Sequence, residues 1–205
     1  MMKQLDLQSL VREILGDDYR QYEVSKYTLT EDIAVGRANI LCHMTCQISH
    51  EGSDETYAIE GTGVGMVDAL FKGLKTTLSE RYPSLEHIEF VEFGVTGDFT
   101  SNSDDSSHSD AQGRVRLAVK NTEDRRFNFE STSLSVSASS VSVVVKAVEH
   151  FVNAELAVLR IYDWIEDAQS RNRPDLAEKY THRLADLVQN ATYSTSIERR
   201  KSIQR

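Results

Sequence analysis

The sequence is poor in cysteine and proline and has no long apolar run. Two cysteines among 205 residues are typical of proteins kept in a reducing compartment. No segment approaches the ~20 apolar residues of a membrane span, and the N-terminus lacks the apolar stretch of a signal peptide. We therefore expect a cytoplasmic protein that has no membrane partner.

The sequence also lacks a basic face. Its formal net charge is -9, so nothing supplies the cations that would neutralise a phosphate backbone. This excludes nucleic acid as the expected partner. Apolar residues make up 40% of the chain, which is ample for the core of one domain with an appendage.

A metal site and a catalytic site are both missing from the pattern. Cys42 and Cys46 lie on an alternating stretch, where roughly 13 Å along a strand prevents them from sharing a zinc ion or forming a disulfide. We expect both to pack in the core. The six histidines are scattered, and no nucleophile elbow or phosphate-binding loop occurs. We expect no enzyme, no metal and no cofactor.

The hydrophobic periodicity repeats one order of elements twice. Three strands precede a helix that starts near Met66 and ends before Pro83, with a turn expected at Glu31–Asp32. Three further strands precede a long helix; the first has a phase shift between Phe90 and Val91 that indicates a bulge. The expected strands are 19–31, 33–52, 55–61, 85–95, 113–121 and 125–132, and the long helix is 141–170, with a start that suits a strand equally well. The pattern predicts an α+β fold.

The C-terminal part predicts a helical hairpin, because Pro174 suits the first turn of a new helix. We divide the chain into an N-terminal helix (1–17), a βββα-βββα domain (18–155) and a helical extension with a basic tail (156–205). The acidic, serine-rich loop at 100–110 is expected to be solvated.

Three glycines at alternate positions, Gly61, Gly63 and Gly65, run directly into the first long helix. One interpretation is a strand-to-helix turn that needs glycine dihedrals. The other is a binding site, in which bare backbone at a helix start attracts a carboxylate. Asp68 would then cap the helix or meet an ammonium group.

The stretch "GVGMVDALFKGL" resembles the C-terminal regulatory (dimerisation) domain of the alpha-isopropylmalate synthase and citramalate synthase family, with Met66 where proline is usual. "AQGRVRLAVKN" is similar to that domain's fifth strand, and "SSVSVVVKAVEHFVNAE" to its second helix. The resemblance covers residues 19–155. In this chain the family's catalytic barrel is absent, and "SVSASSVS" stands in place of the second glycine motif, with Val136 and Ala138 where bare backbone is expected.

The resemblance implies two pseudo-symmetric βββα modules that dimerise and bind leucine or isoleucine between modules. It places Gly63, Val64, Gly65, Val67 and Asp68 on the ligand-facing turn, and Phe90 and Gly94 on the following strand. We expect a free-standing, non-catalytic homodimeric module that senses a branched-chain amino acid or similar small carboxylate, and acts on a partner enzyme in trans. The alternative is a ligand-free dimerisation scaffold that docks a partner through its C-terminal helices.

Overall fold

The computed structural model describes residues 4–33, 40–50, 53, 55–98, 112–188, 193 and 196–199. The chain forms two antiparallel sheets of three strands, and each sheet is followed in the sequence by its own helix. The first module comprises β1 (Tyr22–Ile33), β2 (Ile40–His50), β3 (Thr56–Gly63) and α2 (Met66–Ser79). The second comprises β4 (Glu89–Asp98), β5 (Gln112–Lys120), β6 (Arg126–Ser133) and α3 (Val136–Ser170). The expected α+β fold of two βββα modules is confirmed.

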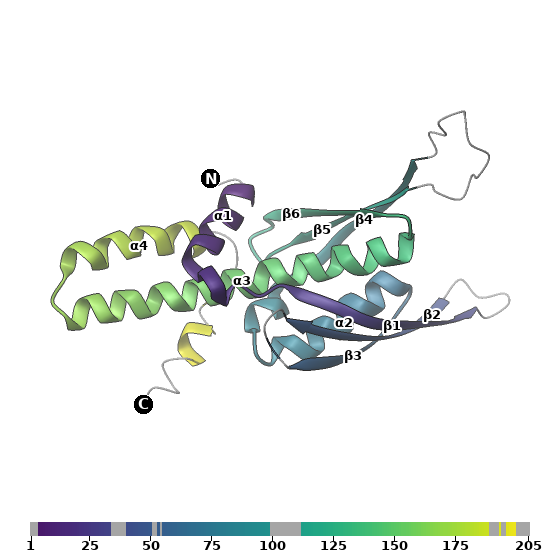
Figure 1. Cartoon of the computed structure of the whole chain (residues 1–205), viewed down its shortest axis with the longest axis horizontal. Coiled ribbons are helices and arrows are strands. Elements are labelled where there is room, and N and C mark those ends of the chain that lie inside the picture. Colours follow the sequence, from purple (N-terminus) through teal and green to yellow (C-terminus); the bar gives the residue numbers. More distant parts are fainter. Residues whose placement is uncertain are drawn as a thin grey trace.

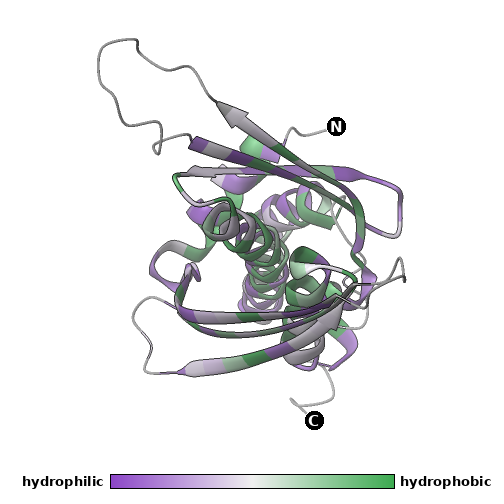
Figure 2. Cartoon of the chain, turned by 90° about the vertical axis from the view of Figure 1, so that its right-hand side faces the viewer, coloured by the Kyte–Doolittle hydropathy of each residue, from purple (hydrophilic) through white to green (hydrophobic). Residues whose placement is uncertain are grey.

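The two sheets enclose two helical segments between them. Figures 1 and 2 show α2 and the first half of α3 lying side by side in the space between the sheets. The helix α1 (Gln4–Leu15) and a 3-10 turn (Gly16–Asp18) precede the first module, and a second 3-10 turn (Pro83–His87) joins the modules. The inner faces of both sheets are apolar, and Cys42 and Cys46 lie there, buried and free as expected.

The modules share the same strand irregularity, which shows that they are true structural equivalents. Val24 pairs with Ile48 immediately before a bulge in β1, and Phe90 pairs with Val119 immediately before a bulge in β4. A bulge inserts one extra residue and increases the local twist of the strand. The bulge expected after Phe90 is confirmed. The equivalent bulge in β1 shows that the two modules also share the same strand register.

The junctions between the last strand and the helix also correspond. Cys42 pairs with Gly63 at the end of β3, and Gly113 pairs with Ser133 at the end of β6. Each strand end is followed by one intervening residue and an N-cap residue, Gly65 or Ser135. Each position of the first junction therefore has a defined counterpart in the second.

Two boundaries differ from the sequence-based expectation. The prediction of a turn at Glu31–Asp32 was wrong, because β1 continues through both residues and Glu31 pairs with Cys42. The long helix begins at Val136 rather than 141, so its valine-rich start is helical. Burial against the sheet outweighs the weak helix propensity of β-branched residues here.

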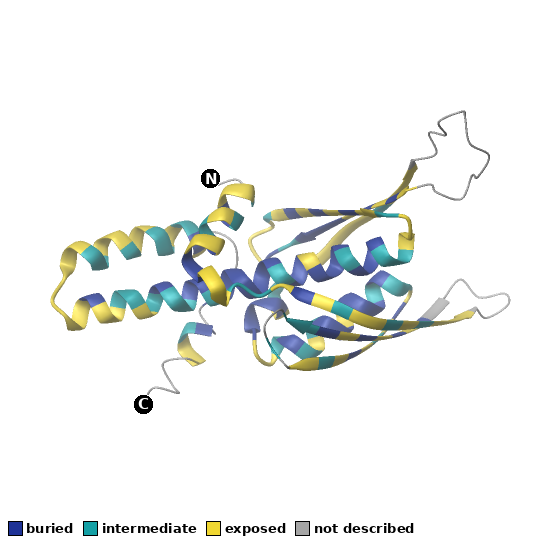
Figure 3. Ribbon diagram, in the orientation of Figure 1, coloured by how far each residue is buried: buried dark blue, intermediate teal, exposed yellow. Residues whose placement is uncertain are grey.

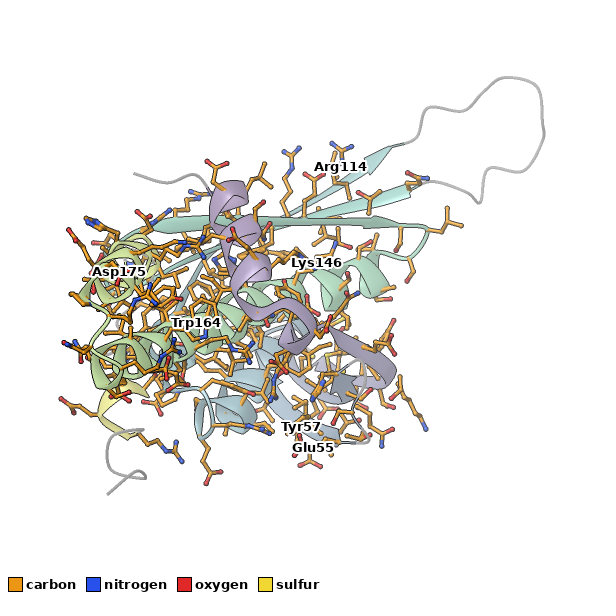
Figure 4. The ribbon with its side chains drawn as sticks, turned by 60° about the vertical axis from the view of Figure 1, so that its left-hand side comes forward. Glu55, Tyr57, Arg114, Lys146, Trp164 and Asp175 are labelled. Atoms are coloured by element: carbon orange, nitrogen blue, oxygen red, sulfur yellow. The ribbon has the colours of Figure 1, made fainter. Side chains whose placement is uncertain are left out.

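The predicted helical hairpin is confirmed. The second half of α3 leaves the sandwich and packs against α4 (Pro174–Val188), with the rings of Trp164 and Tyr180 5.3 Å apart (Figures 1 and 4). In Figure 3 most of the first half of α3 is buried, whereas the hairpin is mostly intermediate or exposed. Because α3 passes through residues 155 and 156 as a single helix, the division of the chain into three parts stays a prediction.

Candidate functional site

The glycines before α2 are explained first by contact within the chain. A Cβ at Gly61 would lie 1.9 Å from the carbonyl oxygen of Ala69, and a Cβ at Gly73 would lie 2.7 Å from that of Glu60. At Gly63 the added carbon would lie 2.6 Å from the amide nitrogen of Ala69. These three glycines allow α2 and β3 to pack backbone against backbone.

Gly65 is different, because the space around it is open. A Cβ there would meet no atom within 4 Å, and its φ of 178° is extended backbone that any residue can adopt. Gly65 is the N-cap of α2, and no side chain caps the helix at this position. Neither packing nor dihedral strain therefore explains the third glycine, and the space beside Gly65 at the start of α2 is open.

Asp68 stabilises this turn. One of its carboxylate oxygens, Oδ2, accepts a hydrogen bond from the Val64 amide (3.1 Å) and lies 2.7 Å from Lys72 Nζ. The carboxylate is thus already engaged on one side by the turn and on the other by a cation. Its first role is to hold residues 64–68 in one conformation and to keep a lysine beside the start of α2.

The remaining expected site residues lie in different environments. Val64 is 71% exposed at the tip of the turn, whereas Val67 points into the core. Phe90 and Gly94 lie on β4 in the other sheet, and Phe90 contacts α2 through an edge-to-face pair with Phe71 (6.2 Å between ring centroids). The structure therefore gathers Gly63, Val64, Gly65 and Asp68 in one turn but buries Val67.

The corresponding turn of the second module is built from serines. Ser131, Ser133 and Ser135 occupy the positions of Gly61, Gly63 and Gly65. The expectation that Val136 and Ala138 replace the bare backbone was wrong, since these residues correspond to Met66 and Asp68.

The serines close the second turn by hydrogen bonds. Ser133 Oγ lies 2.8 Å from Ser139 Oγ, which in turn donates to the Gly113 carbonyl oxygen. Ser135 Oγ accepts from the Ala138 amide and so caps α3. The second helix start is satisfied by the chain itself, whereas the first lacks such a cap.

The edge strand β4 exposes apolar side chains. Phe93 (36% exposed) and Val95 (48%) point toward the helix side of the sheet, since they pair with the buried Leu117 and Val115. Their counterparts in the first module, Tyr27 and Leu29 on β1, are half-buried. An apolar edge strand is a template for pairing or for contact with another chain.

A cavity of about 550 Å³ lies between β1 and α3, and the sequence pattern gave no signal for it. It is lined by residues 21–27, apart from Glu23, and by one face of α3 that ends at Glu149. Burial raises the pKa of Glu149 to about 7. The cavity depends on contact between strands and helices far apart in the chain, so local periodicity could not reveal it.

Neither cysteine has the surroundings of a reactive thiol. Burial raises the pKa of both, to about 11 for Cys46. Among the residues that the structure describes, no three His, Cys, Asp or Glu side chains gather as a metal site, and no helix is long and apolar enough to cross a membrane. The serine-rich loop at 100–110 and the end of the basic tail lie outside the described residues.

The paired βββα modules, with one closed and one open helix start, define a two-module α+β domain. The sequence profile of the LeuA allosteric (dimerisation) domain matches residues 1–152, and the chain belongs to this family. The match includes α1 and both modules, and it ends within α3. The matched domain is a regulatory one rather than a catalytic one. No curated protein matches the chain.

Proposed function

We propose that this chain forms a homodimer and binds a small carboxylate effector, such as a branched-chain amino acid, at the start of α2. The bound state would regulate a partner enzyme in trans. The observation that carries the proposal is the open, uncapped Gly65 in a chain that belongs to an allosteric dimerisation family. The ligand-facing residues would be Gly63, Val64, Gly65 and Asp68.

The chemistry of the turn favours a carboxylate. The first amides of a helix have no partner within the helix, and the helix dipole gives this end a partial positive charge. Lys72 lies nearby, but its charge is balanced by that of Asp68, so the amides and the helix dipole carry the preference for a carboxylate. A side chain at Gly65 would occupy the approach, which gives a physical reason for glycine at a position with no backbone strain.

The turn is a surface feature, so a partner copy would supply the far wall of the site. Val64 is exposed at the turn, and so are Leu134 and Val136 at the corresponding turn of the second module. Phe93 and Val95 on β4 are exposed apolar side chains as well, and none of the described residues covers these five. Because the family is a dimerisation domain, we propose that a second copy covers them.

Calorimetric titration of the full chain with leucine, isoleucine and valine tests effector binding. We expect heat and a rise in melting temperature with at least one of them, because a ligand that binds only the native state stabilises it. Gly65→Val should abolish both effects without lowering the melting temperature of the free protein. Thr28→Val is the matched control, because it adds valine on the exposed outer face of β1. Absence of heat and of a melting shift at millimolar concentrations of all three would overturn effector binding.

Sedimentation equilibrium tests the dimer separately. Phe93→Lys with Val95→Lys should shift the chain toward monomer, because two charges would be buried at the interface. Leu5→Lys, at an apolar residue on α1 that is 75% exposed, should leave the dimer intact. A wild-type chain that sediments as a monomer would contradict the proposal.

A second candidate, a scaffold that docks a partner through its C-terminal helices, is favoured by one observation. The end of α3 and all of α4 lie beyond the residues that match the family. The same two experiments separate the candidates. A dimer that shows no heat with any of the three amino acids favours the scaffold.

A further inference from the structure

The cavity between β1 and α3 has the size of a ligand pocket. Its volume, about 550 Å³, falls within the range of roughly 300–1,000 Å³ typical of small-molecule sites. One wall is the β1 segment that contains Tyr22, Val24 and Tyr27. The other is a single face of α3: Ala138, Val141, Ser142, Val145, Lys146 and Glu149. The cavity lies apart from the glycine turn, and none of its lining residues belongs to residues 61–68.

The near-symmetry of the modules explains why space is left here. Val24 corresponds in register to Phe90, and Val141 corresponds to Phe71. Where β4 meets α2, the two phenylalanine rings contact each other edge to face. Where β1 meets α3, two valines stand in their place and are too short to fill the same volume. The cavity therefore lies where β1 and α3 lack the aromatic pair that β4 and α2 have at the equivalent contact.

Glu149 places a carboxylate on the wall of this cavity. Glu149 corresponds to Ser79 of the first module, so a charge has been placed beside the space that the small side chains leave. Its carboxylate accepts a hydrogen bond from the Tyr22 amide, at 2.5 Å. Among the residues that the structure describes, no cationic side chain lies within ion-pair distance of Glu149. Lys146, also on the cavity wall, donates instead to the Glu130 carbonyl oxygen.

A half-buried carboxylate without a cation is costly, and a ligand cation would remove that cost. The apolar part of the lining, which includes Val24, Val141 and Val145, would bury an apolar group of the same ligand. At the other end of the cavity the Tyr27 hydroxyl donates to Ser137 Oγ (3.1 Å), so that hydroxyl is already satisfied within the chain. Glu149 is the one carboxylate among the lining residues, which also include the cations Lys26 and Lys146.

We propose that this cavity binds a small amphipathic primary amine, with its ammonium group on Glu149 and its apolar body between Val24 and Val141. The site is independent of the effector site at the start of α2, which recognises a carboxylate. The two sites therefore differ in the ligand group that they require.

Titration of the full chain with isoamylamine and with isocaproate distinguishes the sites, because each compound keeps the branched apolar body but carries only one charge. At about pH 8, above the pKa of about 7, Glu149 is ionised and the amine is protonated. We expect isoamylamine to bind, and Glu149→Gln to weaken that binding at least tenfold. Gly65→Val, which blocks the carboxylate site, should leave amine binding unchanged.

A second variant keeps the test informative if Glu149→Gln proves poorly folded. Val24→Phe adds, at the corresponding place, the ring that Phe90 supplies on β4, and it should abolish amine binding by filling the cavity. The melting temperature of each variant reports on its fold. No detectable binding of isoamylamine by the wild-type chain would overturn the proposal, and so would equal binding by folded Glu149→Gln.

Discussion

The close packing of α2 on β3 makes a quantitative prediction for Gly61→Ala. The added carbon would lie 1.9 Å from the Ala69 carbonyl oxygen, whereas real contacts of this kind are essentially never below 3.0 Å. The helix would have to move by about 1 Å, because the backbone fixes the positions of both the added Cβ and the carbonyl oxygen and no rotamer change relieves the clash. Overpacking of this kind costs about 3 kcal/mol.

Thermal unfolding followed by circular dichroism measures this cost. For a chain of this size, a loss of about 3 kcal/mol lowers the melting temperature by about 6–12 °C. Gly65→Val is the control, because a side chain there meets no atom and the backbone is already extended. We expect its stability to remain within about 0.5 kcal/mol of wild type. Equal melting temperatures for Gly61→Ala and the wild type would refute the packing explanation of the first two glycines.

Three further predictions concern charge and capping. Burial raises the pKa of Glu149 from 4.5 to about 7, so the folded state binds this proton more tightly than the unfolded state. Stability should therefore fall by about 1–2 kcal/mol as the pH rises from about 4.5 to 7, allowing for partial screening of a half-buried group. In urea titrations Glu149→Gln should remove this contribution and leave that of Glu155, whose pKa burial also raises. Asp68→Ala should cost about 1 kcal/mol, because it frees the Val64 amide and separates Lys72; unchanged urea midpoints would contradict this. Ser135→Ala should cost about 1 kcal/mol by uncapping α3, and in the double variant with Asp68→Ala the two costs should add, since the residues stabilise the turns of different modules.

Local sequence was sufficient for the order of elements and for several of their details. Alternation and helical spacing predicted both βββα modules, and the phase shift after Phe90 predicted the bulge. Pro174 correctly indicated the first residue of α4. The start of α3 was missed, because its valines suit strand and helix equally until the packing on β5 and β6 decides between them.

The candidate site was less predictable, because its features depend on contacts between elements. The three glycines look alike in sequence, yet Gly61 and Gly63 face the helix backbone whereas Gly65 faces open space. The serines of the second turn could be matched to these glycines only once the strand register was known. The cavity arises between Val24 and Val141, which belong to different modules, and no local window of sequence contains both.

The most direct test of the proposed function is the titration of leucine, isoleucine and valine into the wild-type chain and into the Phe93→Lys, Val95→Lys variant. If the effector site lies at a seam between two copies, the wild-type dimer should bind at least one of these amino acids. The monomeric variant, with its helix start intact, should bind far more weakly. Equal affinity in the dimer and in a folded monomer would contradict a site shared between subunits.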